Sequence, residues 1–169
     1  FDYRSGSAGA ITTLDVGFHP DSVKFSADGT KLYVVNEGEF TSGGATDAPG
    51  SISIIDLTGV SSAADLATLT NSAVTTYDFQ AANLASGVSM DGLRYNDLSA
   101  GAAANRYRHV EPEFITEANG KLLVSLQENN ALAEFDPATG QWTAIRSLGT
   151  ITNTIDASDR DGAGGTALA

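Results

Sequence analysis

Acidic and amide side chains gather at the two ends of one strand-rich stretch of this sequence. The stretch "EPEFITEANGKLLVSLQENNALAEFD", residues 111–136, begins with Glu111 and Glu113 and later reaches the polar run 127–130, "QENN". A tight hairpin places the entry of its first strand beside the exit of its second. We therefore expect the two ends to form one polar site. Carboxylate and amide oxygens are the ligands that Ca²⁺ and Mg²⁺ prefer, so the chemistry indicated is cation binding.

The same pattern occurs earlier in the chain, in "PDSVKFSADGTKLYVVNEGE". The two stretches share three marks at a spacing of 91 or 92 residues: Pro20 with Pro112, Asp28-Gly29 with Asn119-Gly120, and Asn36-Glu37 with Gln127-Glu128. Each stretch is followed by a strand-like run that ends in Asp, "GSISIIDL" and "NALAEFD". Half of the spacing is about 45 residues, the blade period of many β-propellers.

This repeat predicts an all-β chain built as a β-propeller of four-stranded blades. The predicted blades lie near residues 16–60, 70–100 and 111–150, and the last contains strands at 114–117, 121–126, 131–135 and 141–148. A short helix is expected within residues 61–69, where Ser and Asp can cap it. The alternative is a β-sandwich with two hairpins that are similar by chance.

A propeller closes with roughly 4–8 blades, whereas 169 residues supply three to four. Residues 1–169 are therefore expected to form a partial propeller domain. The remaining blades would come from the same protein or from a second chain, and the start "FDYRSGSAGA" is typical of a processed protein or an internal fragment.

The net negative charge of the chain excludes some classes of binding partner. The chain has 21 acidic against 9 basic residues and a net charge of −12, which argues against nucleic acid and anionic lipid. It has no Cys, which excludes thiolate metal sites and disulfides. No apolar run approaches the ~18 residues of a membrane span. The remaining partner classes are cations, a phosphorylated small molecule or a surface matrix.

Hairpin geometry in both repeats would bring six carboxylates onto a common rim near the propeller axis. They are Asp21, Glu37, Glu39, Glu111, Glu113 and Glu128. Carboxylates this close repel one another unless protons or a cation intervene, and oxygen ligands favour Ca²⁺, with Mg²⁺ as the alternative. The simpler interpretation is that Glu128 and Asn129 only decorate a solvated turn, whose geometry Asn129 and Asn130 provide.

Other residues offer chemistry with less support. The loop 156–162, "DASDRDG", places Asp156, Asp159 and Asp161 at a spacing like that of a calcium loop, although it lacks the EF-hand spacing and could be a surface turn. Arg94 is the candidate phosphate ligand, with Arg106 and Arg108 nearby. His19 and His109 stand just before the repeat prolines, where loop histidines are common. No nucleophile elbow or P-loop occurs, so catalytic residues stay unassigned.

Several stretches together resemble one family. They are "PDSVKFSADGTKLYVVNEGE", "GSISIIDL", "EPEFI", "LQENNALAEFD" and "DASDRDG", in this order. They are similar to the secreted bacterial β-propeller proteins of the choice-of-anchor I family, which are also described as alkaline-phosphatase-like or as mesenchyme-specific cell-surface glycoprotein-like. The resemblance covers about residues 16–162, and Arg94 in "DGLRY" matches a G-V-R-like position of the family.

The resemblance implies an exported propeller that is longer than this chain, with phosphatase-like or phytase-like activity. Two departures matter: the loop 40–50 is not the acidic loop expected after "NEGE", and the later blades are absent from the sequence. We expect an extracellular or periplasmic protein associated with the cell surface.

Two functions stay open at this point. The first is a binding or structural module that holds divalent cations. The second is a Ca²⁺-dependent phosphoesterase, active when the propeller is complete, in which the cation would activate water and Arg94 would pair with the phosphate.

If the rim holds a cation, the double substitution Glu37→Ala and Glu128→Ala should reduce the rise in melting temperature that added Ca²⁺ produces. The reason is that two of the proposed ligands are lost. The shift is measured by differential scanning fluorimetry. Identical shifts in variant and wild type would count against a metal role for these two residues.

Overall fold

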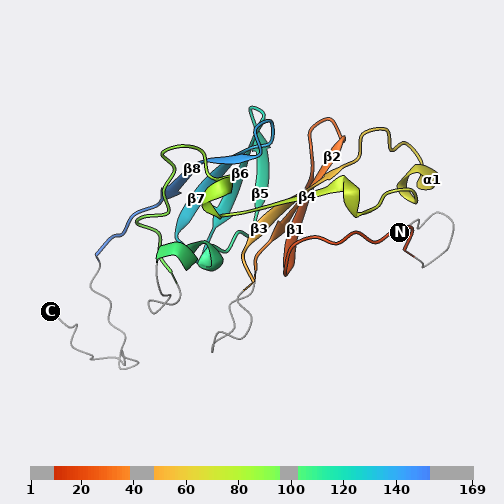
Figure 1. Ribbon diagram of the computed structural model, residues 1–169. Helices are drawn as coiled ribbons and strands as arrows, with labels where there is room; N and C mark the ends of the chain where they lie inside the picture. The colour runs from red at the N-terminus through yellow and green to blue at the C-terminus, as the bar shows by residue number, and fades with distance from the viewer. Residues whose placement is uncertain (1–9, 39–47, 96–102, 153–169) are drawn as a thin grey trace, which may run out of the picture.

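The computed structural model describes residues 10–38, 48–95 and 103–152. They form two four-stranded antiparallel sheets in which each strand pairs with the next along the chain (Figure 1). The strands are β1 Pro20–Phe25, β2 Lys31–Asn36, β3 Ser51–Asp56, β4 Val74–Asp78, β5 Ile115–Ala118, β6 Lys121–Leu126, β7 Ala131–Asp136 and β8 Gln141–Ser147. The helical turns are α1 Ala63–Leu66, η2 Asn71–Ala73, η3 Ala81–Asn83 and η4 Ala103–His109. The predicted all-β class is confirmed.

The strands predicted for the second sheet all form, for the expected reason. Apolar and polar positions alternate, so Leu122 and Val124 of β6 are fully buried while Leu123, on the opposite face, is exposed. Asn119 and Gly120 join β5 to β6 with φ angles of 52° and 73°, the left-handed conformation that a two-residue hairpin turn needs.

The segment between the two repeats differs from the prediction. A separate blade is expected near residues 70–100, yet the strand found there, β4, pairs with β3 as the outer strand of the first sheet. The described residues between β4 and β5 form turns and 3₁₀ helices and contain no further strand. The repeat spacing of about 91 residues therefore corresponds to one sheet and its connection to the next, and not to two blades. The short helix predicted within residues 61–69 is α1, which Ser62 caps by accepting a hydrogen bond from the Asp65 backbone N–H.

The two sheets repeat one internal design. Lys31 at the start of β2 lies opposite Asp56 at the end of β3. In the second sheet, Lys121 at the start of β6 forms an ion pair of 2.5 Å with Asp136 at the end of β7. These two Lys–Asp pairs identify equivalent positions in the sheets.

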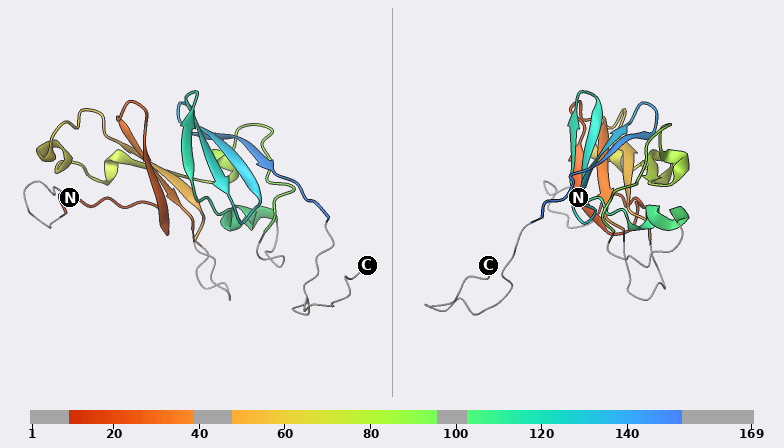
Figure 2. Two further views of the ribbon diagram at one scale, coloured as in Figure 1. Left: turned by 180° about the vertical axis from the view of Figure 1, so that it is seen from behind. Right: turned by 90° about the vertical axis from the view of Figure 1, so that its left-hand side faces the viewer.

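The inner strands β1 and β5 lie side by side and point the same way (Figures 1 and 2). The Ser22 hydroxyl donates to the backbone oxygen of Glu113 at 2.5 Å, near the start of both strands. At the other end, the Ala27 backbone N–H donates to the Glu117 carboxylate at 2.9 Å. The same ends of the two sheets are therefore neighbours.

Aromatic side chains fill the space between the outer strands. Trp142 of β8 is fully buried, stacks on Phe79 with ring centroids 4.2 Å apart, and donates its indole N–H to the backbone oxygen of Asp78 at 2.9 Å. Phe135 lies between Trp142, at 5.1 Å, and Tyr77 of β4, at 4.8 Å. One apolar core thus joins both sheets.

Gly50 marks a point of close approach between the first sheet and the segment that leads into β5. A Cβ atom there would lie 2.2 Å from the Val110 oxygen and 2.8 Å from the Glu37 oxygen, both backbone atoms. Gly50→Ala should therefore destabilise the fold by roughly 3 kcal/mol, because backbone atoms must move apart. Gly120→Ala is the matched control: it meets no atom within 4 Å, and only its φ of +73° opposes it, at about 1 kcal/mol.

Urea unfolding followed by circular dichroism measures both variants. Equal losses in the two variants would mean that the contact at Gly50 does not restrain the fold.

Candidate functional site

The rim of the first sheet is built where the chain enters β1 and leaves β2. The backbone N–H groups of Glu37 and Gly38 donate to the backbone oxygens of His19 and Phe18, at 2.9 and 3.1 Å. His19 has a φ of 53°, an unusual conformation for a residue other than glycine. The next residues carry a β-bulge, since Pro20 pairs with Asn36 but Ser22 already pairs with Val35. Strain and a bulge together turn this end of β1 out of the regular pleat.

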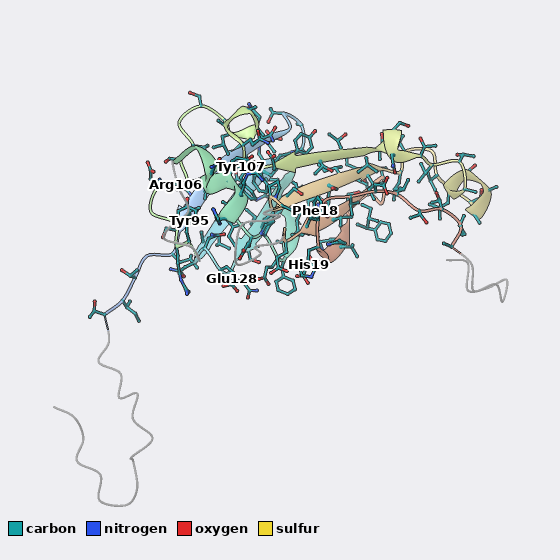
Figure 3. All side chains as sticks on the ribbon, turned by 60° about the horizontal axis from the view of Figure 1, so that its bottom comes forward. Phe18, His19, Tyr95, Arg106, Tyr107 and Glu128 are labelled. Atoms are coloured by element: carbon teal, nitrogen blue, oxygen red, sulfur yellow. The ribbon has the colours of Figure 1, made fainter. Side chains whose placement is uncertain are left out.

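Asp21 is the extra residue of that bulge and is exposed. Beside it, Glu37 approaches His19, with 3.1 Å between Oε2 and the imidazole Nδ1. Figure 3, which turns this end of the molecule forward, shows His19 and Glu128 on it. The predicted pairing of the entry of β1 with the exit of β2 is therefore found in the structure.

Glu37 experiences the charges of both sheets. Burial raises the pKa of its carboxyl above the usual value, His19 opposes this shift, and the negative charges of Glu113, Asp21 and Glu128 add to the rise. Four of the six predicted rim carboxylates therefore interact electrostatically. The arrangement favours a proton or a cation near Glu37 over a full set of negative charges.

The rim of the second sheet is held by amide side chains. The Glu113 backbone N–H donates to the Ser125 oxygen at 3.0 Å, and the Gln127 side-chain amide donates to the Glu113 carboxylate. Glu111 is buried, in contrast to the half-buried Glu113 and Glu128. Residues 111–113 and the polar run 127–130 do meet, and side chains of that run join them.

Asn129 is fully buried and has a structural task. Its Oδ1 accepts a hydrogen bond from the Glu111 backbone N–H at 2.9 Å. Its Nδ2 donates to the backbone oxygens of Arg94, at 2.8 Å, and His109, at 2.7 Å. Asn130 has a φ of 50°, as a turn residue needs. Asn130 therefore supplies turn geometry as predicted. The interpretation that Asn129 decorates a solvated turn is wrong, because Asn129 is buried and bonds three backbone groups.

The structure pairs the residues of the two repeats differently from the sequence comparison, by one position in the second strand. Residues 26–30 join β1 to β2, whereas Asn119 and Gly120 alone join β5 to β6, so matching the turn glycines moves the second strands out of register. Counted from Lys31 and Lys121, Glu37 corresponds to Gln127 and not to Glu128. A one-residue shift places side chains on the opposite face of a sheet. The two rims are therefore related in position without being identical in sequence.

Arg94 is exposed, and its backbone is fixed by Asn129. Its N–H donates to the Asn129 oxygen at 3.1 Å, in addition to the bond that its own oxygen accepts from Asn129. His109, by contrast, is buried.

The remaining metal candidates cannot be placed. Glu39 and the loop residues Asp156, Asp159 and Asp161 lie outside the described residues. Within residues 10–38, 48–95 and 103–152, no three His, Asp or Glu side chains converge closely enough to hold a metal ion. A metal role for Glu37, Glu111, Glu113 and Glu128 stays a prediction.

A sequence model of the choice-of-anchor I domain matches residues 1–167. The chain belongs to the choice-of-anchor I family. No curated protein and no solved structure matches it. Choice-of-anchor domains are typical of extracellular and surface proteins, which agrees with the predicted localisation. No helix among the described residues of this choice-of-anchor I domain is long and apolar enough to cross a membrane.

A buried polar row in this choice-of-anchor I domain was missed from the sequence. Asn36 donates to the hydroxyls of Ser51, at 3.1 Å, and Ser53, at 3.0 Å, and Ser53 lies 2.7 Å from the Thr76 hydroxyl. The row lies on the face of the first sheet that is turned away from the second. The equivalent positions of β6 and β7 are apolar: Leu126, Ala131 and Ala133. The alternating serines of "GSISIID" are the sequence feature that could have revealed it.

Asn129→Ala should destabilise the domain by roughly 3 kcal/mol, because it leaves one buried N–H and two carbonyl groups without their partner. Asn71→Ala is the control. The Asn71 side chain is exposed and bonds only Asp15 among the described residues, so its loss should cost about 1 kcal/mol or less. Thermal unfolding of both variants gives the comparison. A cost for Asn129→Ala no larger than that for Asn71→Ala would contradict the structural role.

Proposed function

We propose that this chain is an extracellular, surface-associated binding or structural module. It consists of two consecutive blades of a β-propeller, with an acidic rim at one end of the inner strands. The main support is the equivalence of the two sheets. Both have the same strand order, and β1 of the first lies beside β5 of the second, which is the relation expected between successive propeller blades.

The exposed face of the second sheet supports a further blade. Counted from the equivalent Lys–Asp pairs, Tyr33 corresponds to Leu123 and Ile52 to Leu132. Tyr33 and Ile52 are 2% and 0% exposed because the second sheet covers them, whereas Leu123 and Leu132 are 40% and 48% exposed. The same positions that are core in the first blade are thus uncovered in the second. We propose that the remaining blades, from the same protein or a second chain, pack there.

The rim gives this module a function. The charges of Asp21, Glu113 and Glu128 act on Glu37, so a divalent cation that approaches the rim relieves their repulsion. Ca²⁺ fits the oxygen groups best, with Mg²⁺ as the alternative. Because the described acids do not converge into a closed shell, we expect weak binding, with a dissociation constant of about 10⁻³ M, typical of extracellular modules.

One observation favours the phosphoesterase alternative. The backbone oxygen of the exposed Arg94 accepts a hydrogen bond from Asn129, the residue after Glu128, so the chain segment that carries this guanidinium is anchored to the segment that carries a rim carboxylate. In that case Arg94 would orient a phosphorylated small molecule and the cation would polarise it. Turnover of a chromogenic phosphate ester that depends on both Ca²⁺ and Arg94 would favour this alternative over the binding module.

The face that carries Leu123 and Leu132 provides the test. An apolar face that lacks its covering blade should associate with another copy, so the chain should dimerise at micromolar concentrations. Leu123→Glu with Leu132→Glu should restore the monomer and leave the circular dichroism spectrum unchanged, because both side chains point to solvent. Leu148→Glu, an exposed residue just after β8, is the control and should leave the dimer intact.

Light scattering after size-exclusion chromatography reads out the mass of each variant. A wild-type chain that is monomeric at every concentration would contradict a blade-binding face.

A further inference from the structure

Three of the chain's nine basic residues lie within residues 94–108 in a protein of net charge −12, and the Arg106 guanidinium contacts Tyr95, the residue after Arg94. They are Arg94, Arg106 and Arg108, and they alternate with two tyrosines, Tyr95 and Tyr107. We call these five residues the basic–aromatic patch. Arg106, Tyr107 and Arg108 belong to η4, and Figure 3 shows Arg106 with Tyr95 and Tyr107 on one side of the molecule. Tyr95 and Tyr107 are partly buried and pack against the core that joins the two sheets, so they anchor the patch to the fold.

Arg106 is held in a defined position. Its guanidinium carbon lies 5.9 Å from the centroid of the Tyr95 ring, and its Nη1 pairs with the Asp91 carboxylate at 3.0 Å. Tyr95 is itself fixed, because its hydroxyl donates to the Met90 backbone oxygen at 2.8 Å. A guanidinium that lies on an aromatic ring keeps its in-plane N–H groups available to an oxyanion. Arg106 remains 40% exposed, so a ligand can reach it.

A second pair has the same form. The Arg108 guanidinium lies 5.3 Å from the centroid of the Tyr107 ring, and Tyr107 packs against the core. Arg94 adds a third cation whose backbone Asn129 holds in place. The patch therefore offers several positive groups on a rigid base, and it loses little conformational entropy when it binds an anion.

The net charge decides which anion fits. Duplex DNA carries one charge per about 1.7 Å, so a chain with twelve excess negative charges repels most of its length. A glycan with one carboxylate or sulfate per sugar unit is more sparsely charged. It can place a few charges on the patch while its neutral groups contact the tyrosines.

We propose that the basic–aromatic patch binds an anionic glycan. This inference rests on the proposed extracellular binding function, since such polymers are met at surfaces. The shared recognition chemistry is an oxyanion on a sugar, and carboxylate and sulfate are its two sources.

The test uses the whole chain and four polymers in isothermal titration calorimetry at low salt. Alginate carries carboxylates, dextran sulfate carries sulfates, neutral dextran lacks charge, and duplex DNA supplies a dense phosphate polymer. We expect binding to alginate or dextran sulfate, no binding to neutral dextran and weaker binding to DNA. The response to the first two polymers identifies the preferred oxyanion. Affinity should fall as salt rises.

The double variant Arg106→Gln and Arg108→Gln should bind at least tenfold more weakly, because two charge-assisted contacts are lost. Arg106→Lys should recover only part of the loss, since ammonium neither stacks nor binds in a bidentate manner. Arg146→Gln, on β8 and outside the patch, is the matched control and should bind like wild type.

Absence of binding to both anionic glycans would overturn the proposal, as would DNA binding as tight as theirs. An equal loss in the Arg146→Gln control would also overturn it, because general charge would then explain the binding. Dimerisation through Leu123 and Leu132 is measured on the same samples. If it persists while glycan binding is absent, only the patch is rejected, and the proposed blade module stands.

Discussion

The contact of Trp142 with Phe79 and Asp78 determines how the two sheets are arranged. The indole belongs to the last strand of the second sheet, but it stacks on and donates to residues that directly follow the last strand of the first sheet. The segment after Phe79 then continues along β8, where Leu84 forms a parallel bridge with Trp142. The outer edges are thereby tied together while β1 and β5 meet at the inner edge. With both edges fixed, the second sheet has one orientation relative to the first.

That orientation produces the rim. Because the two sheets present the same end to the same side, Asp21 and Glu37 of the first come within electrostatic range of Glu113 and Glu128 of the second. Neither sheet has this concentration of charge alone. The amides of Gln127 and Asn129 then have separate tasks: Gln127 contacts Glu113 at the surface, and Asn129 ties the chain beneath it.

Hairpins and strands could be predicted from the sequence because their causes are local. Alternation in "KLLVSL" and the Asn119-Gly120 turn specify β5 to β8 almost to the residue. Whether residues 70–100 form a separate blade could not be predicted in the same way. β4 is a short strand, and whether it completes one sheet or begins another depends on pairing with β3 across the long segment 57–73.

The candidate site was also predictable in part. The meeting of strand entry and exit follows from hairpin geometry, so the approach of His19 to Glu37 and of Glu113 to Gln127 was foreseeable. The register was not, because residues 26–30 form a longer turn than the glycine match suggests. Asn36 is therefore equivalent to Leu126 and not to Gln127. The basic–aromatic patch depends on the path of an irregular segment. Such a segment has no repeating sequence pattern, so its path could not be predicted.

The pKa of the Glu37 carboxyl tests the shared rim of the two sheets most directly. It is measured by NMR titration in the wild type and in the variant Glu113→Gln with Glu128→Gln. Stacking of the two sheets in one sense predicts a wild-type pKa above the usual 4.5. In the variant it should fall toward that value, while burial keeps it from falling fully. A Glu37 pKa that does not respond to these two substitutions in the other sheet would contradict the shared rim, and with it the arrangement of the sheets.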